Sequence, residues 1–185
     1  MEESFSNYTP MVRTRGFRVG AVIVLVLAIA LILWLVLRDD GGSSTSSSAK
    51  AVSVGQIRKL AASVGHPIYW VGPRDGYTYE RTRQSNGTII IRYLPQGVKA
   101  GDKKPHLSVA TYPFAGAFPA VEKAARKSGS DSFEIPDGGL AVFNRSYPKS
   151  IHLAYPESDY QVEVFDPSPT QVRELVSSGQ VSTIG

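Results

Sequence analysis

Histidine is the residue in this sequence best suited to bind a metal or to act as a general base, and the three present stand alone. His66, His106 and His152 have no second histidine or carboxylate at the spacing used by protein zinc sites. The chain also has no cysteine, which excludes thiolate ligands and a cysteine nucleophile. We therefore predict no metal site and no cofactor, and we expect each histidine to be solvated or bonded locally.

Serine nucleophiles are the next candidates, because the sequence contains two Ser-x-x-Lys matches. Enzymes with this motif present the serine at the start of a helix. Pro148 interrupts the match at Ser146, and the match at Ser47 lies in a Gly/Ser-rich stretch. The sequence has no nucleophile elbow, zinc-protease motif, phosphate-binding glycine loop or calcium loop. We assign no catalytic residue, and a carboxylate pair assembled from distant segments remains an open alternative.

Acidic and basic residues predict an ordinary solvated surface. Residues 51–185 carry 15 basic and 12 acidic side chains, a net charge of +3 spread along the chain, with no stripe typical of nucleic-acid binding. Asp159, Glu163 and Asp166 are expected to face solvent. The densest basic segment contains Lys99, Lys103 and Lys104; solvation is the favoured interpretation, and contact with anionic lipid or a wall polymer is the alternative.

Aromatic side chains are the most distinctive feature of the predicted strands. Rings of this kind can line a groove for a glycan or a peptide, and we name as candidate ligand contacts Tyr69, Trp70, Tyr77 and Tyr79. Sheet cores also favour aromatic residues, so a structural role is the preferred interpretation.

One segment is long and apolar enough to cross a membrane. Val19 to Leu37 contains only one residue without a hydrophobic side chain, Gly20, and its 19 residues span about 30 Å as a helix. Arg18 and Arg38 bound the run, and Trp34 suits an interfacial position. We predict a retained single-pass signal-anchor. A cleaved signal peptide is the alternative, although the charged residues after Leu37 do not suit a cleavage site.

The flanking charges predict the orientation of this segment. Three arginines precede it and only Arg38 follows closely, which favours an N-terminus in the cytoplasm. We therefore expect a cytoplasmic tail over residues 1–18, a transmembrane helix over 19–37, a flexible Gly/Ser linker over 38–50 and a domain outside the plasma membrane over 51–185.

Helix signals are clear at two places in the domain, and a third segment is a candidate helix. Ser53 and Gln56 form a capping box before an amphipathic run that predicts a helix over residues 54–64. Ser168 and Pro169 begin a terminal helix that Gly179 stops. Helical spacing of apolar residues predicts the third helix over 117–127.

We predict that the rest of the domain forms antiparallel strands. Aromatic and β-branched runs, separated by turn signals such as Asn86-Gly87 and Asp137-Gly138, predict eight strands. The expected ranges are 68–71, 77–82, 88–94, 107–112, 132–135, 140–145, 151–155 and 160–165. A shift of 62 residues aligns Ile89 with Ile151 and Asp75 with Asp137, which is consistent with an α-β-β-β-β duplication; chance similarity is the alternative. The predicted fold class is α+β.

Several runs resemble a known group of proteins. His66 to Pro73, Tyr93 to Gly97, Gly138 to Val142 and Gln161 to Pro167 resemble uncharacterised single-pass membrane-anchored proteins of high-GC Gram-positive bacteria. The resemblance covers most of residues 51–185 and implies a cell-envelope setting, but it brings no functional residues.

Three functions follow as hypotheses. The first is a non-catalytic binding or envelope-associated module whose partners are the lipid bilayer, through residues 19–37, and an envelope polymer or membrane protein. The second is an envelope hydrolase acting on glycan or peptide. The third is an accessory subunit of a membrane complex.

Overall fold

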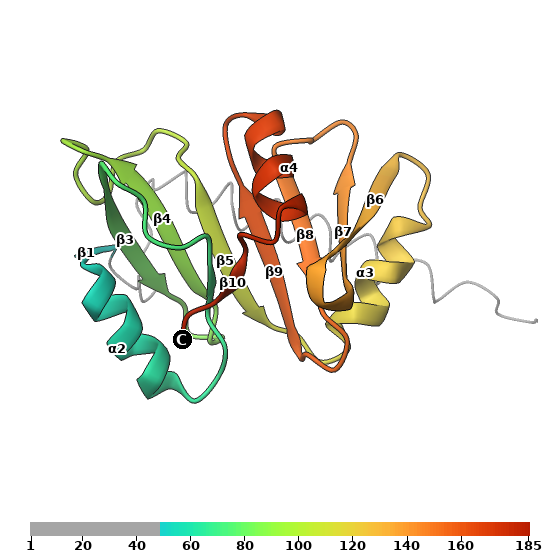
Figure 1. The fold of residues 1–185 in the computed structure, drawn as a ribbon, viewed down its shortest axis with the longest axis horizontal. Helices are drawn as coiled ribbons and strands as arrows, with labels where there is room; N and C mark the ends of the chain where they lie inside the picture. Colours follow the sequence, from blue (N-terminus) through green and yellow to red (C-terminus); the bar gives the residue numbers. More distant parts are fainter. Residues whose placement is uncertain (1–48) are drawn as a thin grey trace, which may run out of the picture. The chain divides into compact units, whose positions relative to one another are not determined.

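The computed structural model describes residues 49–185, which form one antiparallel sheet of eight strands, a smaller two-stranded sheet and three α-helices (Figure 1). Strand order in the large sheet is β1-β3-β4-β5-β9-β8-β7-β6. The strands are β1 (Lys50–Val52), β3 (Tyr77–Arg83), β4 (Ile89–Pro95), β5 (Ser108–Pro113), β6 (Ser130–Ile135), β7 (Gly139–Asn144), β8 (Ser150–Ala154) and β9 (Tyr160–Phe165). The predicted α+β class is therefore confirmed.

The helices begin and end where local signals direct them. Helix α2 (Val54–Val64) has the predicted bounds, because Ser53 and Gln56 cap each other's backbone N–H and Gly65 adopts a left-handed conformation after the last turn. Helix α4 (Pro169–Ser177) starts at Ser168, whose side chain accepts a hydrogen bond from the N–H of Gln171. Helix α3 (Ala117–Ala125) is two residues shorter than predicted.

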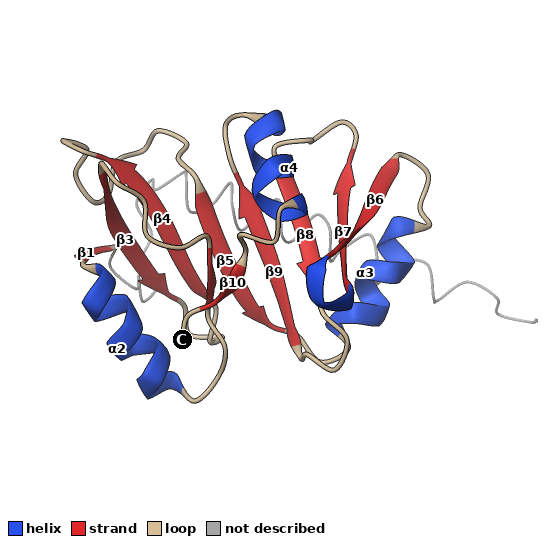
Figure 2. Cartoon of the chain, viewed as in Figure 1, coloured by secondary structure: helices blue, strands red, loops and turns tan. Residues whose placement is uncertain are grey.

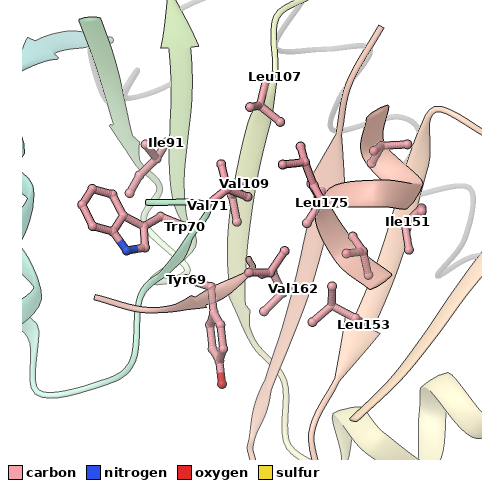
Figure 3. Packing of buried hydrophobic residues seen from close by; sticks show 14 of the residues in the cluster. Tyr69, Trp70, Val71, Ile91, Leu107, Val109, Ile151, Leu153, Val162 and Leu175 are labelled. Atoms are coloured by element: carbon pink, nitrogen blue, oxygen red, sulfur yellow. The ribbon is translucent and has the colours of Figure 1, made fainter. Parts of the chain in front are cut away.

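The main core lies on one face of the sheet, beneath α2 and α4. Alternate residues of the central strands contribute Ile91, Val109, Leu153 and Val162, all fully buried, and Leu175 of α4 packs on them (Figure 3). Helix α3 covers the opposite face, where Val121 packs in a separate cluster with side chains of β7 and β8. Helices therefore cover both faces of the sheet, α2 and α4 on one face and α3 alone on the other.

The small sheet joins the beginning of the domain to its end. Strand β2 (Tyr69–Trp70) pairs with β10 (Ser182–Thr183), and the N–H of Ile184 donates to the carbonyl of Ile68 over 2.8 Å. This ribbon crosses in front of the large sheet beside α4 (Figures 1 and 2). Residues from the two ends of the domain thus complete one layer over the main core.

Two short strands differ from the sequence expectation. The sequence indicated that residues 68–71 form one of eight strands, yet β2 is only two residues long and pairs outside the large sheet. The eighth strand of the large sheet is instead β1, at its edge, and its first residue, Lys50, falls in the predicted linker. The strands that were not predicted, β1 and β10, have no apolar alternation to reveal them.

The predicted membrane segment, with Val19, Trp34 and Leu37, and its flanking residues Arg18 and Arg38 lie outside the described residues. Within residues 49–185, none of the helices is both long and apolar enough to span a bilayer.

Candidate functional site

The candidate site is an open groove of about 280 Å³ at the β1 edge of the sheet. It is bordered by β1, the neighbouring strand β3 and the outer face of α2. The lining side chains are Lys50, Val52, Gln56, Lys59, Leu60, Ser63 and Arg81. Three of the seven are cations and none is an acid, so the groove is suited to an anion.

Sheet register brings two of the cations together. Lys50 of β1 and Arg81 of β3 are directly opposite partners in an antiparallel pair. Side chains in that relation lie on the same face with Cβ atoms about 5 Å apart, and like charges there repel each other. Within residues 49–185, neither Lys50, Arg81 nor Lys59 has a carboxylate within salt-bridge distance. An anion in the groove would relieve this repulsion.

Helix α2 supplies the other wall. Gln56, Lys59 and Ser63 recur at helical spacing, so they share one side of α2, whereas Ile57 on the other side is fully buried in the main core. The capping box and Gly65 fix both ends of the helix, and Ile57 packs its inner side into the main core. Val52 and Leu60 are half-buried and give the groove an apolar floor.

The groove belongs to the basic half of a strongly polarised domain. Residues 49–113 form the β1-β3-β4-β5 half of the large sheet and contain ten basic and three acidic residues, a net charge of +7. Residues 114–185 form the β9-β8-β7-β6 half and contain six basic and nine acidic residues, a net charge of −3. The even spread expected for the net charge of +3 over residues 51–185 is therefore wrong, because the basic excess lies before residue 114 and the topology places those residues in one half of the sheet.

A buried ion pair stabilises the basic half from the opposite face of the sheet. Glu80 is 2% exposed and accepts a hydrogen bond of 2.7 Å from Arg92, its partner on β4, and another from the N–H of Gly101. Arg92 also donates to the carbonyls of Asp102 and Lys104 over 2.9 and 3.0 Å. These bonds hold the loop over residues 96–106, which carries the predicted basic cluster, against the sheet.

A second set of contacts, made by Asp102, lies within the same loop. Asp102 accepts from the N–H of Lys104 and pairs with Nε2 of His106 over 2.9 Å. Hydrogen bonds from His106 and from the Lys104 N–H lower the pKa of Asp102. His106 is thus bonded locally, as expected.

The other two histidines are not among the residues that line the groove. His66 stacks on Tyr160 and contacts the Pro67 carbonyl through Nδ1. His152 lies on β8 opposite Glu163, and its buried Nδ1 has no hydrogen-bond partner in the described part of the chain. In residues 49–185, no three histidine or carboxylate side chains are grouped in a way that could hold a metal ion.

The four candidate aromatic residues serve mainly in packing. Tyr69, Trp70 and Tyr79 are 7%, 6% and 5% exposed and belong to the main core. The Tyr69 ring stacks on Tyr155 at 5.6 Å, and burial raises the pKa of its hydroxyl. Tyr77 is half-buried with the Arg74 guanidinium 5.5 Å above its ring. The structure therefore brings these rings into the core and not into the groove.

The expectation that Glu163 and Asp166 face solvent is wrong. They are 3% and 5% exposed. Glu163 accepts hydrogen bonds from the hydroxyls of Tyr112, over 2.7 Å, and Ser150. Asp166 accepts from the N–H of Ser168, over 2.7 Å, at the start of α4. Alternation correctly shows which face a side chain joins, but it does not show whether that face is covered.

The two buried glutamates do not form a catalytic pair. Glu80 lies on β3 and Glu163 on β9, with β4 and β5 between them. Three strand spacings amount to about 14 Å, well beyond the roughly 5 to 9.5 Å that separates the carboxylates of glycoside hydrolases.

Sequence reasoning missed the groove because its members come from segments assigned to different roles. Lys50 was assigned to the linker, and Lys59 and Arg81 were counted only as surface charge. The signal that could have revealed it is the excess of basic residues in residues 49–113, once those residues are known to form one half of the sheet.

Comparison with known proteins gave no match to a family model, to a curated protein or to a solved structure.

Proposed function

We propose that this protein is a single-pass membrane-anchored module whose domain lies outside the plasma membrane and binds an anionic component of the cell envelope without catalysing a reaction. The observation that carries the binding role is the basic groove, in which Lys50, Lys59 and Arg81 converge without a carboxylate from the described residues. The anchor is supported by the sequence of residues 19–37 and its flanking charges.

The alternative of an envelope hydrolase has less support. Its motivation was a set of aromatic strands and scattered acids, but three of the four named rings are buried. The buried glutamates, Glu80 and Glu163, lie three strands apart. No observation favours the accessory-subunit hypothesis over the binding module.

The strand arrangement supports a limited internal duplication. The orders β3-β4-β5 and β7-β8-β9 are related by a two-fold arrangement about the centre of the sheet. Ile89 and Ile151, which the sequence shift aligned, both face the main core. Helices α2 and α3 pack on opposite faces, so we infer that the repeated unit is the three-strand meander without its helix.

Protease protection tests the anchored topology. The domain should be digested when protease is added to intact spheroplasts, and the chain should stay with the membrane after alkaline carbonate washing. An Arg13→Glu, Arg15→Glu, Arg18→Glu variant is the matched test of orientation, because it removes the basic bias. A wild-type domain that is protected in intact cells, or one released with a new N-terminus after Leu37, would contradict the proposal.

A further inference from the structure

We propose that the ligand of the basic groove is the phosphate headgroup of anionic phospholipid in the membrane that anchors the chain. This inference rests on the proposed anchored topology and adds the ligand class and the docking surface. The domain would then lie with its β1 edge and α2 against the bilayer.

The groove offers the donors that a phosphate needs. An arginine guanidinium can donate two parallel hydrogen bonds to phosphate oxygens, and lysine supplies a mobile point charge. Arg81 comes from β3, Lys50 from β1 and Lys59 from α2, so the three charges surround the opening from different elements. Val52 and Leu60 offer an apolar floor to the glycerol and first methylene groups of a lipid.

The length of chain before the groove favours the membrane over a more distant polymer. Twelve residues, 38–49, separate the predicted span from Lys50, the first residue of β1. A Gly/Ser-rich linker of that length has a root-mean-square span of about 20 Å. The β1 edge is therefore the part of the domain that the tether brings closest to the headgroups.

The charge distribution of the whole domain favours the same orientation. The half that contains the groove carries +7 and the other half −3, so an anionic surface attracts the first and repels the second. Lys99, Lys103 and Lys104 are on the attracted half and add to its positive potential. Each basic residue that reaches an anionic surface strengthens association by roughly fivefold.

Energy transfer in lipid nanodiscs provides the test on the full-length chain. The native chain has no cysteine, so an Ala62→Cys substitution gives one labelling site on the exposed side of α2, beside the groove. Ser177→Cys on α4 provides the matched site in the acidic half. Acceptor dye is placed on lipid headgroups, in discs of pure phosphatidylcholine or discs with one third phosphatidylglycerol.

The expected result is greater transfer from position 62 in anionic discs than in neutral discs, with a much smaller change at position 177. The difference should disappear at about 1 M salt, where the Debye length is about 3 Å. A Lys50→Glu, Lys59→Glu double variant should lose it, and a Lys123→Glu, Lys127→Glu double variant, which changes charge equally in the acidic half, should keep it. Transfer that is equal in both kinds of disc would overturn the proposal.

A soluble phosphate ion offers the groove the same phosphate oxygens as a lipid headgroup. A titration with inorganic phosphate distinguishes these two ligands. Inorganic phosphate is added to the chain labelled at position 62 in neutral discs. A saturable change in dye emission there, without a response to anionic lipid, would assign the groove to a soluble anion and overturn the lipid proposal. A chain that fails to stay in the discs would overturn the anchored topology itself, whereas a stable insertion without the lipid response would overturn only this inference.

Discussion

The two halves of the sheet each bury a glutamate on the same face, but they stabilise it differently. In the basic half, Glu80 is paired with Arg92 and accepts a backbone N–H from the loop over residues 96–106. In the acidic half, Glu163 accepts hydrogen bonds from the hydroxyls of Tyr112 and Ser150, and the described residues place no cation within salt-bridge distance.

This difference shows what each carboxylate does for the fold. Glu80 and Arg92 form hydrogen bonds with backbone N–H and carbonyl groups of the loop over residues 96–106. The two side chains therefore hold the loop in place in addition to attracting each other. Glu163 links β5, β8 and β9 through neutral donors, and its contribution depends on hydrogen bonding more than on charge. The halves therefore predict different responses to similar substitutions.

Arg92→Met should give the largest effect. It leaves Glu80 buried without its cation and releases two loop carbonyls, which should lower the free energy of unfolding by about 3–5 kcal/mol. Urea denaturation of the domain over residues 49–185 measures the change. Arg145→Met is the matched control in the acidic half, because its pair with Asp131 is exposed and should contribute less than about 1 kcal/mol. Equal losses in both variants would contradict the comparison.

Gly139→Ala tests packing in the acidic half. A Cβ at this position would lie 2.7 to 2.9 Å from side-chain atoms of Ile135 and Tyr155. We expect a loss of about 1–3 kcal/mol in the free energy of unfolding, measured by the same urea transition. Gly55→Ala in α2 is the control in the basic half: its Cβ meets nothing closer than 3.9 Å, so it should stabilise by about 0.5–1 kcal/mol.

Alkaline pH should destabilise both halves together. Burial raises the pKa of Tyr155 to about 12, and it also raises the pKa of Tyr93 and Tyr112. A tyrosine with a higher pKa in the folded state keeps its proton while the unfolded chain loses one. The contribution of these tyrosines to the free energy of unfolding should therefore be constant below the ordinary pKa near 10, and the free energy should fall as pH rises through 10 to 12. Urea midpoints across this range check the trend, and Tyr155→Phe should reduce the slope.

Glu163→Gln should have the smallest effect. The amide keeps one acceptor, and the Tyr112 and Ser150 hydroxyls can rotate to donate or accept, so the cost should be below about 1 kcal/mol. Glu80→Gln should cost more than Glu163→Gln, since it leaves the Arg92 charge half-buried without its partner. The opposite ranking in urea denaturation would mean that the Glu163 charge is the more important one.

Local sequence signals predicted the elements whose ends are set by short-range chemistry. The capping box at Ser53 and the glycine at position 65 gave α2 its bounds, and Asn86-Gly87 marked the turn between β3 and β4. Strands β1 and β10 escaped prediction because they are short and exposed, and their partners lie far away in the sequence. The groove could not be predicted for the same reason, since the Lys50–Arg81 register joins two distant segments.

The pairing of β2 with β10 has a consequence for biogenesis. In the proposed topology the domain emerges from a translocation channel N-terminus first, so β2 follows β1 and α2, and more than a hundred further residues must emerge before its partner strand β10. Until then the backbone of Tyr69 and Trp70 has no strand to pair with. Their rings also lack Val181 and Ile184, which belong to the same buried core in the folded domain. Newly exported chains would therefore pass through an interval in which this aromatic segment is available to chaperones and proteases outside the membrane.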